Sequence, residues 1–179
     1  MAKLVIGIVI GALVVYLIMN SSEDAQTSTN LSESPAYVAN KAVAEAMFQA
    51  VIDEDMEAWA ATVSDTVKYT SPSYAPGTAT GAGTKEDWMK DTQRLVDNYD
   101  DFSIENAVYL PGLDGQTAEP NGSVRVYVHW NATHSSGVKV DPWFYYNFDG
   151  FEGGKITTYG AFGDAGGVMN NVAAASAGE

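Results

Sequence analysis

The sequence predicts an α+β domain in which helices come first and pack on one face of a mainly antiparallel sheet. Apolar residues recur at helical spacing in three segments between about residues 36 and 97, whereas from residue 102 onward they alternate at every second position. Segments rich in Gly and Pro separate the alternating runs, as they do in strands joined by hairpins. With 179 residues, of which 46% are apolar, the chain is long enough for one such domain and additional segments.

Charge and composition exclude several classes of function. The chain has 9 Lys and Arg against 23 Asp and Glu, a formal net charge of −14. Nucleic acids and anionic lipid surfaces both attract basic proteins, so we expect neither as a partner. The absence of cysteine excludes disulfides, thiolate zinc sites, iron–sulfur clusters and cysteine nucleophiles. We expect no cofactor.

An apolar segment opens the chain. Residues 4–19 hold no charge and, with their flanks, approach the length that a helix needs to cross a bilayer. We therefore expect residues 1–20 to form an uncleaved, single-pass transmembrane anchor. Lys3 before the segment and Glu23 and Asp24 after it favour a cytoplasmic N-terminus and a domain outside the cell membrane. The alternative is a cleaved signal peptide and a secreted or periplasmic domain, although no small-x-small cleavage site follows the segment.

The folded part is expected to begin after a stalk. Residues 21–34 are polar and rich in Ser and Thr, which predicts a flexible stalk. The domain then covers residues 35–172, and residues 173–179 form a short tail. Its first helix covers about residues 36–52, with Pro35 in the first turn and Ser34 as the N-cap.

Two more helices flank a first strand. Residues 56–63 form a short helix, and residues 67–70 alternate like a strand. A Pro- and Gly-rich loop follows over residues 71–83. A capping box of Thr84 and Asp87 then starts the third helix, which ends near residue 97.

Strands and hairpins fill the second half of the domain. Residues 149–154 are predicted as a hairpin loop, and Gly166 and Gly167 as the end of the last strand. The predicted strands cover residues 102–110, a run from residue 124 to about 131, residues 138–148 and residues 155–163.

Residues 36–172 resemble the SnoaL-like branch of the NTF2-like superfamily. The segments AMFQAVIDEDMEAWAATVSDTVKYTSP, SVRVYVHWNATH and FEGGKITTYGAFGD carry the resemblance, and the last ends at Asp164. Their order and spacing are more specific than any one of them. The resemblance implies a cone-shaped fold with three N-terminal helices on a curved sheet.

The resembled superfamily includes ketosteroid isomerases, polyketide cyclases and dehydratases as well as binding domains. At the position of the isomerases' catalytic Tyr this chain has Met47. At the position of their carboxylic acid it has Tyr146 or Asn147, and at the position of their Asp it has Ser71. Where the cyclases have an Asp and a His, it has Asn147 and Tyr159. None of these side chains is a base near neutral pH, so the substitutions favour a non-catalytic domain.

Two carboxylates and one tyrosine keep the enzymatic alternative open. A shift of one residue in strand register would turn Asp149 or Asp141 into the cone, beside Tyr159. An isomerase, cyclase or dehydratase acting on a small apolar substrate would then be the function.

The interior of the predicted cone is expected to be mostly aromatic. Such a cleft suits a small, flat, apolar or weakly polar ligand. A further alternative is a structural subunit in which side chains fill the cone. The candidate pocket residues are Met47, Trp59, Tyr69, Trp88, Tyr99, Trp130, Phe144, Tyr146, Asn147 and Tyr159.

Three polar residues receive structural assignments. His129 and His134 lie five positions apart on one strand and should point to opposite faces, so we expect no metal site. Asp164 is expected to accept backbone N–H groups at a turn.

The outward face of the sheet is expected to be an association surface. Tyr127, His129, Trp143 and Tyr145 alternate onto one face, and aromatic residues are enriched at protein interfaces. The sequence therefore predicts a membrane-tethered domain that binds a small ligand or acts as an accessory subunit, in a homo-oligomer or a larger membrane complex.

Overall fold

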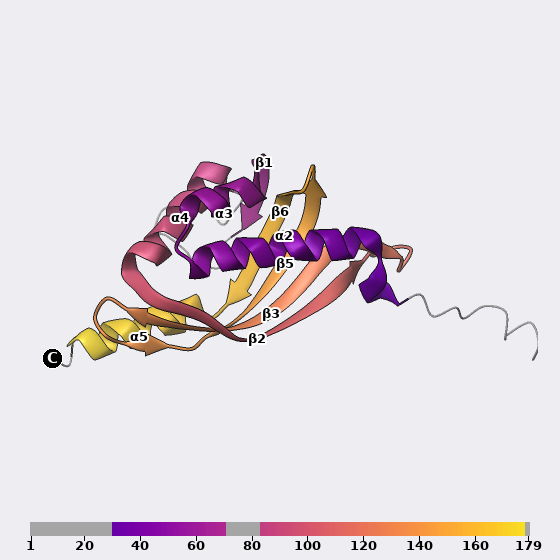
Figure 1. The fold of residues 1–179 in the computed structure, drawn as a ribbon. Helices are drawn as coiled ribbons and strands as arrows, with labels where there is room; N and C mark the ends of the chain where they lie inside the picture. The colour runs from indigo at the N-terminus through magenta and orange to yellow at the C-terminus, as the bar shows by residue number, and fades with distance from the viewer. Residues whose placement is uncertain (1–29, 71–82, 178–179) are drawn as a thin grey trace, which may run out of the picture. The chain divides into compact units, whose positions relative to one another are not determined.

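Three helices lie on one face of a six-stranded sheet (Figure 1). The computed structural model describes residues 30–70 and 83–177. No helix within these two ranges is long and apolar enough to cross a bilayer. The predicted anchor at residues 1–20 and most of the predicted stalk lie outside them; the stalk's last residues include a short 3₁₀ helix, η1 (Leu31–Glu33).

The three predicted helices are confirmed as α2 (Pro35–Ile52), α3 (Met56–Thr62) and α4 (Lys85–Asn98). Ser34 occupies the N-cap position of α2, but its side chain makes no capping hydrogen bond there. Asp55 caps α3 by accepting backbone N–H groups at its start. The predicted capping box of Thr84 and Asp87 starts α4, so the N-terminus of this helix is fixed by two reciprocal hydrogen bonds.

The strands form one mixed sheet in the order β1-β6-β5-β3-β2, with β4 paired to β3. The neighbouring strands are antiparallel except for β1 and β6, which run parallel. The bounds are β1 (Val63–Thr70), β2 (Tyr99–Leu113), β3 (Pro120–His134), β4 (Lys139–Val140), β5 (Trp143–Glu152) and β6 (Lys155–Gly163).

Two local predictions within the sheet were wrong. The strand expected over residues 138–148 is interrupted at Asp141 and Pro142, because proline has no N–H to donate to a ladder. The hairpin loop expected over residues 149–154 shrinks to Gly153 and Gly154, whose φ angles of 56° and 73° suit a two-residue turn.

The C-terminal segment is a helix, where the sequence analysis predicted a strand end and a tail. The helix α5 (Ala165–Ala177) follows β6 directly and crosses the predicted boundary at residue 173. Asp164 accepts the backbone N–H of Gly167 at 2.7 Å, so its predicted hydrogen bonding to backbone is confirmed, although at a helix start and not a turn. The Ala-rich sequence favours a helix once this first turn forms.

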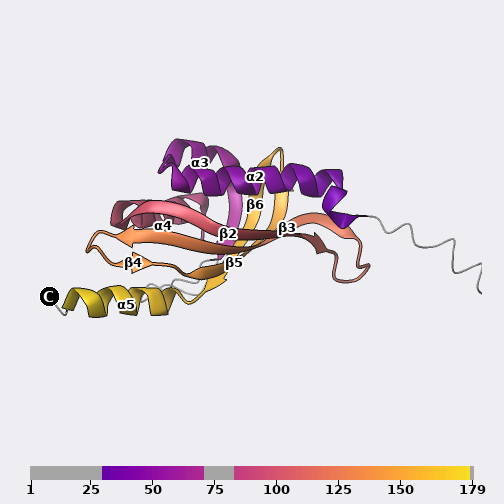
Figure 2. The same cartoon turned by 60° about the horizontal axis from the view of Figure 1, so that its bottom comes forward.

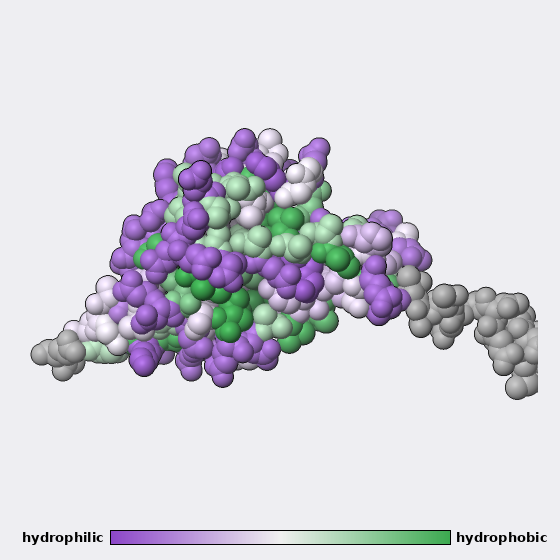
Figure 3. All heavy atoms as spheres, in the orientation of Figure 1, coloured by the Kyte–Doolittle hydropathy of each residue, from purple (hydrophilic) through white to green (hydrophobic). Residues whose placement is uncertain are grey.

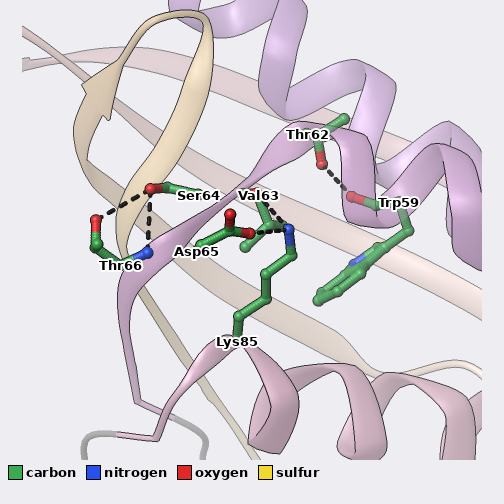
Figure 4. A network of polar contacts seen from close by, with 7 residues as sticks. All are labelled: Trp59, Thr62, Val63, Ser64, Asp65, Thr66 and Lys85. Atoms are coloured by element: carbon green, nitrogen blue, oxygen red, sulfur yellow. Dashed lines mark hydrogen bonds and ion pairs between the residues drawn. The ribbon is translucent and has the colours of Figure 1, made fainter.

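A lysine joins α4 to the start of β1 (Figure 4). The Lys85 ammonium group donates to the Val63 carbonyl at 2.9 Å and to the Asp65 carboxylate at 2.8 Å. Close by, the Thr62 hydroxyl donates to the Trp59 carbonyl at 2.7 Å. These bonds help to fix β1 and α4 relative to each other, and α3, β1 and α4 supply three of the aromatic residues described next, Trp59, Tyr69 and Trp88.

Candidate functional site

The inner face of the sheet, which carries Val124, Val126 and Val128, is covered by the helices. The space between helices and sheet holds a set of touching rings that we call the interior aromatic cluster. Each ring lies 4.1–6.0 Å from a neighbouring ring, centroid to centroid. The members are Phe48, Trp59, Tyr69, Trp88, Trp130, Tyr146, Phe148 and Tyr159.

Trp88 of α4 lies at the middle of one half of this cluster. Its indole stacks on Tyr159 with centroids 4.1 Å apart and on Tyr69 at 5.6 Å with an interplanar angle of 7°. Trp59 of α3 meets it edge-on at 5.0 Å. In the other half, Phe48 of α2 packs edge-on against three rings of the sheet, which are Trp130, Tyr146 and Phe148. The rings therefore join all three helices to the sheet.

Two buried tyrosine hydroxyls lie within the cluster. The Tyr146 oxygen accepts a hydrogen bond from the Trp130 indole N–H at 2.8 Å, which leaves its own proton free to be donated. Tyr159 keeps 8% of its surface exposed, and no hydrogen bond joins its hydroxyl to another described residue; the fully buried side-chain atoms without a hydrogen-bond partner in the described part of the chain are instead Arg125 Nη1 and Asn147 Oδ1. Burial raises the pKa of both hydroxyls above the usual value for tyrosine, so both are neutral donors at physiological pH.

A third tyrosine connects the cluster to a carboxylate at the surface. The Tyr69 hydroxyl donates to Asp91 of α4, and Arg94 lies 3.1 Å from the other oxygen of that carboxylate. Burial, and then the hydrogen bond to Asp91, raise the pKa of Tyr69. Among the described residues, Asp91 is the one carboxylate that hydrogen-bonds a member of the cluster.

The structure places the two carboxylate candidates, Asp149 and Asp141, away from the cluster, whereas the third candidate, Tyr159, belongs to it. Phe148 is fully buried on the inner face, so Asn147 and Asp149 on either side of it point outward. Asp149 pairs there with Arg125 at 2.5 Å and accepts the Asn147 amide. Asp141 lines two hollows beside β4, of about 520 and 370 Å³, and neither hollow includes a residue of the cluster.

The predicted pocket residues divide into three groups. Six aromatic residues of the prediction belong to the cluster; five of them are buried, as is Met47, and Tyr146 is half-buried. Phe144 packs half-buried at the margin of the cluster. Tyr99 lies instead at the junction of α4 and β2, edge-on to His134 at 4.9 Å. Asn147 lies on the outer face, since it alternates with Tyr146.

Three residues of the site were missed by the sequence analysis. Phe48 and Phe148 belong to the interior aromatic cluster, but the prediction named the residues directly before them, Met47 and Asn147. Asp91 could have been found from helix geometry. It lies three residues after Trp88, on the same side of α4.

The two histidines have separate partners. His129 lies 3.2 Å from the Glu105 carboxylate, and its other ring nitrogen lies 3.0 Å from the Asp141 carbonyl oxygen. His134 contacts the Ser136 hydroxyl at 2.8 Å. Over residues 30–70 and 83–177 we find no group of three metal-ligating side chains, and Ser71 lies outside these ranges.

Solved structures share this fold at low sequence identity. A provisionally assigned isomerase from Bacillus subtilis superposes with a TM-score of 0.65 at 10% identity, over 76% of this chain and 94% of that one. A provisionally assigned polyketide cyclase from Xanthomonas campestris gives 0.58 at 13% identity, over 75% and 97%. An NTF2-like protein from Burkholderia xenovorans gives 0.56 at 12% identity, over 75% and 95%. No family model matches the chain, and no curated protein is similar to it in sequence.

Proposed function

We propose that the described domain is a binding module whose interior aromatic cluster receives a flat, mostly apolar small molecule with a hydrogen-bond acceptor, such as a ketone oxygen. Its NTF2-like fold, which the sequence resemblance predicted, is shared with structures provisionally assigned as isomerases and polyketide cyclases. The observation that supports this proposal most is the position of the Tyr146 and Tyr159 rings, 6.0 Å apart among other aromatic rings, with hydroxyls that burial keeps protonated. A hydroxyl in a mostly apolar interior gains from an acceptor, which a ligand can supply.

The surroundings of the Tyr159 hydroxyl set the chemistry of the ligand. Tyr146 lies next to Tyr159, with ring centroids 6.0 Å apart, and offers a second proton for donation. The other neighbours are aromatic rings, which favour an aromatic or fused-ring ligand. Because the raised pKa values keep both hydroxyls protonated, they donate to an acceptor and do not remove a proton from carbon.

Within the cluster, some rings keep a little exposed surface and others keep almost none. Tyr159 and Trp130 keep 8% and 9% of their surface exposed, whereas Trp59 keeps 1% and Phe148 none. On the face shown in Figure 3, hydrophobic residues gather below α2, toward the strands, with hydrophilic residues around them. We propose that a ligand enters at the less buried rings, which must move apart to admit it because the two hollows beside β4 include no residue of the cluster.

The cellular setting is proposed from the sequence alone. Residues 1–20 would tether the domain to the outer side of the cell membrane, where it would present the ligand as an accessory subunit of a membrane assembly. The net charge of −14 is consistent with a protein that stays soluble and does not bind anionic lipid headgroups.

Calorimetric titration with a matched pair of probes tests the proposal. The probes are 9-fluorenone, a flat ketone, and fluorene, which has the same rings without the oxygen. We expect fluorenone to bind more tightly, by the roughly 2- to 12-fold that one neutral hydrogen bond contributes. Tyr159→Phe should remove most of that difference, whereas Tyr127→Phe on the opposite face of the sheet should keep it. Equal affinities for both probes in the unmodified chain would contradict the proposal.

A second candidate, an acid–base enzyme of the isomerase, cyclase or dehydratase type, is favoured by one contact. Asp91 accepts from Tyr69, so a carboxylate is linked to the cluster at its surface end. If this pair transfers protons, Asp91→Asn should abolish turnover of a ketone substrate, measured by exchange of its α-protons with deuterated water. If the α-protons exchange no faster with the unmodified chain than in buffer, the enzymatic candidate is rejected and only the binding function remains.

A further inference from the structure

Six of the eight rings in the interior aromatic cluster belong to tryptophan or tyrosine, the aromatic side chains that give up a single electron most readily. They form a connected series of oxidisable rings, whose members are Trp59, Tyr69, Trp88, Trp130, Tyr146 and Tyr159. Neighbours in this series are 4.1–6.0 Å apart, centroid to centroid, or share a hydrogen bond. Electrons tunnel rapidly between rings in contact, so an electron vacancy formed on one ring of the series can move to the others.

Trp88 is the branch point of the series. Its helix α4 lies beside α3 in both views of the fold (Figures 1 and 2) and also packs on β1. This arrangement places Trp88 against Trp59, Tyr69 and Tyr159. Among the described residues, Trp88 is the one ring of the series in contact with Tyr69. A vacancy formed elsewhere in the series therefore reaches Tyr69 through Trp88.

Gly83 makes room for the Tyr69 ring at this place. A Cβ atom at position 83 would lie 2.2 Å from the Cε1 carbon of Tyr69, far inside van der Waals contact. Because glycine has no Cβ, the ring can lie against the backbone there and stay parallel to Trp88, with an interplanar angle of 7°. The position of Tyr69 in the series is thus fixed by packing on both of its sides.

A proton acceptor distinguishes Tyr69 from the other rings. A tyrosine that loses an electron becomes a strong acid, so its oxidation is easy only where a base takes the proton. Asp91 accepts the Tyr69 hydroxyl proton in a hydrogen bond, and Arg94 holds the other oxygen of this carboxylate at 3.1 Å. Over residues 30–70 and 83–177, no carboxylate accepts from Tyr146 or Tyr159. An electron vacancy is therefore most stable on Tyr69.

We propose that the interior aromatic cluster is a route for one-electron oxidation that ends at Tyr69, where a neutral tyrosyl radical forms. The oxidant is an oxygen-centred radical, which takes one electron from a tryptophan of the series and becomes its anion. The vacancy moves through Trp88, and Tyr69 then returns one electron to the tryptophan. At the same time the Tyr69 O–H bond breaks and its proton passes to Asp91 Oδ2, which becomes a neutral carboxylic acid. Tyr69 has lost one electron and one proton, and the other rings are restored.

The end of the route is closer to solvent than its interior. The Asp91 side chain keeps 33% of its surface exposed and Tyr69 keeps 7%, whereas Trp59 keeps 1%. A dissolved one-electron reductant such as ascorbate can return the electron to Tyr69, and Asp91 then returns the proton. The route therefore carries oxidation away from buried rings, where a persistent radical would attack the packed interior.

Laser photoionisation of the full chain in nonionic detergent tests the proposal. The chain has four tryptophans, and Trp143→Phe removes the one outside the cluster, so in this background every vacancy on a tryptophan starts inside it. Light at the long-wavelength edge of the indole absorption ejects the electron, and dissolved nitrate captures it. We expect the absorbance of the tryptophanyl radical to decay as that of the tyrosyl radical grows.

Two substitutions in this background locate the radical. Tyr69→Phe should remove most of the tyrosyl signal, both in absorbance and in electron paramagnetic resonance of frozen samples. Tyr127→Phe on the outer face of the sheet is the matched control, and it should leave the yield and the rate unchanged. An unchanged tyrosyl yield in Tyr69→Phe would show that the vacancy settles elsewhere and would overturn the proposal, as would the absence of a tyrosyl radical in the background chain.

Asp91→Asn tests the proton transfer and keeps the size of the side chain. An amide is no base for the proton, and a positioned base accelerates a proton-transfer step by about 10²–10⁴-fold, so the tyrosyl radical should form about 100-fold or more slowly. An unchanged rate would contradict the role of Asp91. Trp88→Phe is a further variant that keeps an aromatic ring in place but interrupts the series. It should lower the tyrosyl yield while circular dichroism stays native, and an unchanged yield would rule out the route through Trp88.

Discussion

The two faces of the sheet are built from alternate residues of the same strands, yet they have different properties. On β3, Val124, Val126 and Val128 are fully buried, whereas Tyr127 between them is half-exposed. Both faces carry aromatic rings. What differs is the cover: α2, α3 and α4 pack on the inner face, and the exposed aromatic residues of the outer face have no such cover among the described elements (Figure 1). Aromatic content alone therefore does not distinguish a core from an exposed face, and matched substitutions on the two faces can test the difference.

The largest difference is expected from truncating one ring on each face. Phe148→Ala should lower the free energy of unfolding by about 3–5 kcal/mol, because it opens a cavity among rings that helices hold in place. Tyr127→Ala should change it by no more than about 0.5 kcal/mol at concentrations where the chain is monomeric. Urea unfolding measures both. Similar losses for the two variants would mean that the outer face is also part of the core.

The next comparison lies within the inner face and separates a paired hydroxyl from an unpaired one. Tyr146→Phe removes the acceptor of the Trp130 indole N–H and should cost about 1–3 kcal/mol. Tyr159→Phe removes a hydroxyl with no partner among the described residues, so stability should stay the same or rise slightly. Thermal unfolding of the two variants decides; a large loss for Tyr159→Phe would mean that its hydroxyl is paired within the protein.

High pH should disrupt the inner face through its tyrosines. Burial raises the pKa of Tyr109 to about 12 and raises those of Tyr69, Tyr146 and Tyr159 as well. The folded state then holds protons that the unfolded chain loses near pH 10, so stability should be level up to about pH 10 and fall as the pH rises further. Alkaline unfolding followed by tyrosinate absorbance and circular dichroism should show both changes together. Ionisation of these tyrosines without unfolding would contradict their burial.

The smallest effect is expected from the outer ion pair. Arg125 and Asp149 are partly exposed, so Asp149→Asn should cost only about 0.2–1 kcal/mol and should matter less at high salt. Urea unfolding at two salt concentrations would measure this. A loss of several kcal/mol would place Asp149 in a buried network and reopen its role as a catalytic candidate.

The sequence predicted the elements and the composition of the interior more reliably than the details of single strands. Helix periodicity and the Thr84–Asp87 capping box located α4, because both signals are local. The break at Pro142 and the length of β5 depend on strand pairing, which no local pattern records. Alternation around Phe148 decides that Asn147 and Asp149 point outward, and this required the register with β3 and β6.

The parts of the site that were missed depend on contacts between distant segments. Tyr69 and Asp91 are 22 residues apart and meet because α4 packs beside β1. The missing partner of Tyr159 is likewise a property of the whole interior, since only the assembled structure shows which acceptors lie near it. The C-terminal helix was overlooked because Gly166 and Gly167 usually end an element, whereas here they occupy the first turn after the Asp164 cap.

The central claim is that the Tyr159 hydroxyl donates to an acceptor on a ligand inside the cluster. Infrared spectroscopy of 9-fluorenone bound to the chain measures this directly, because a hydrogen bond lowers the stretching frequency of the ketone. We expect a band at lower frequency in the unmodified chain than in Tyr159→Phe, with Tyr127→Phe matching the unmodified chain. A band that has the same frequency in all three proteins, equal to that of fluorenone in an apolar solvent, would contradict it.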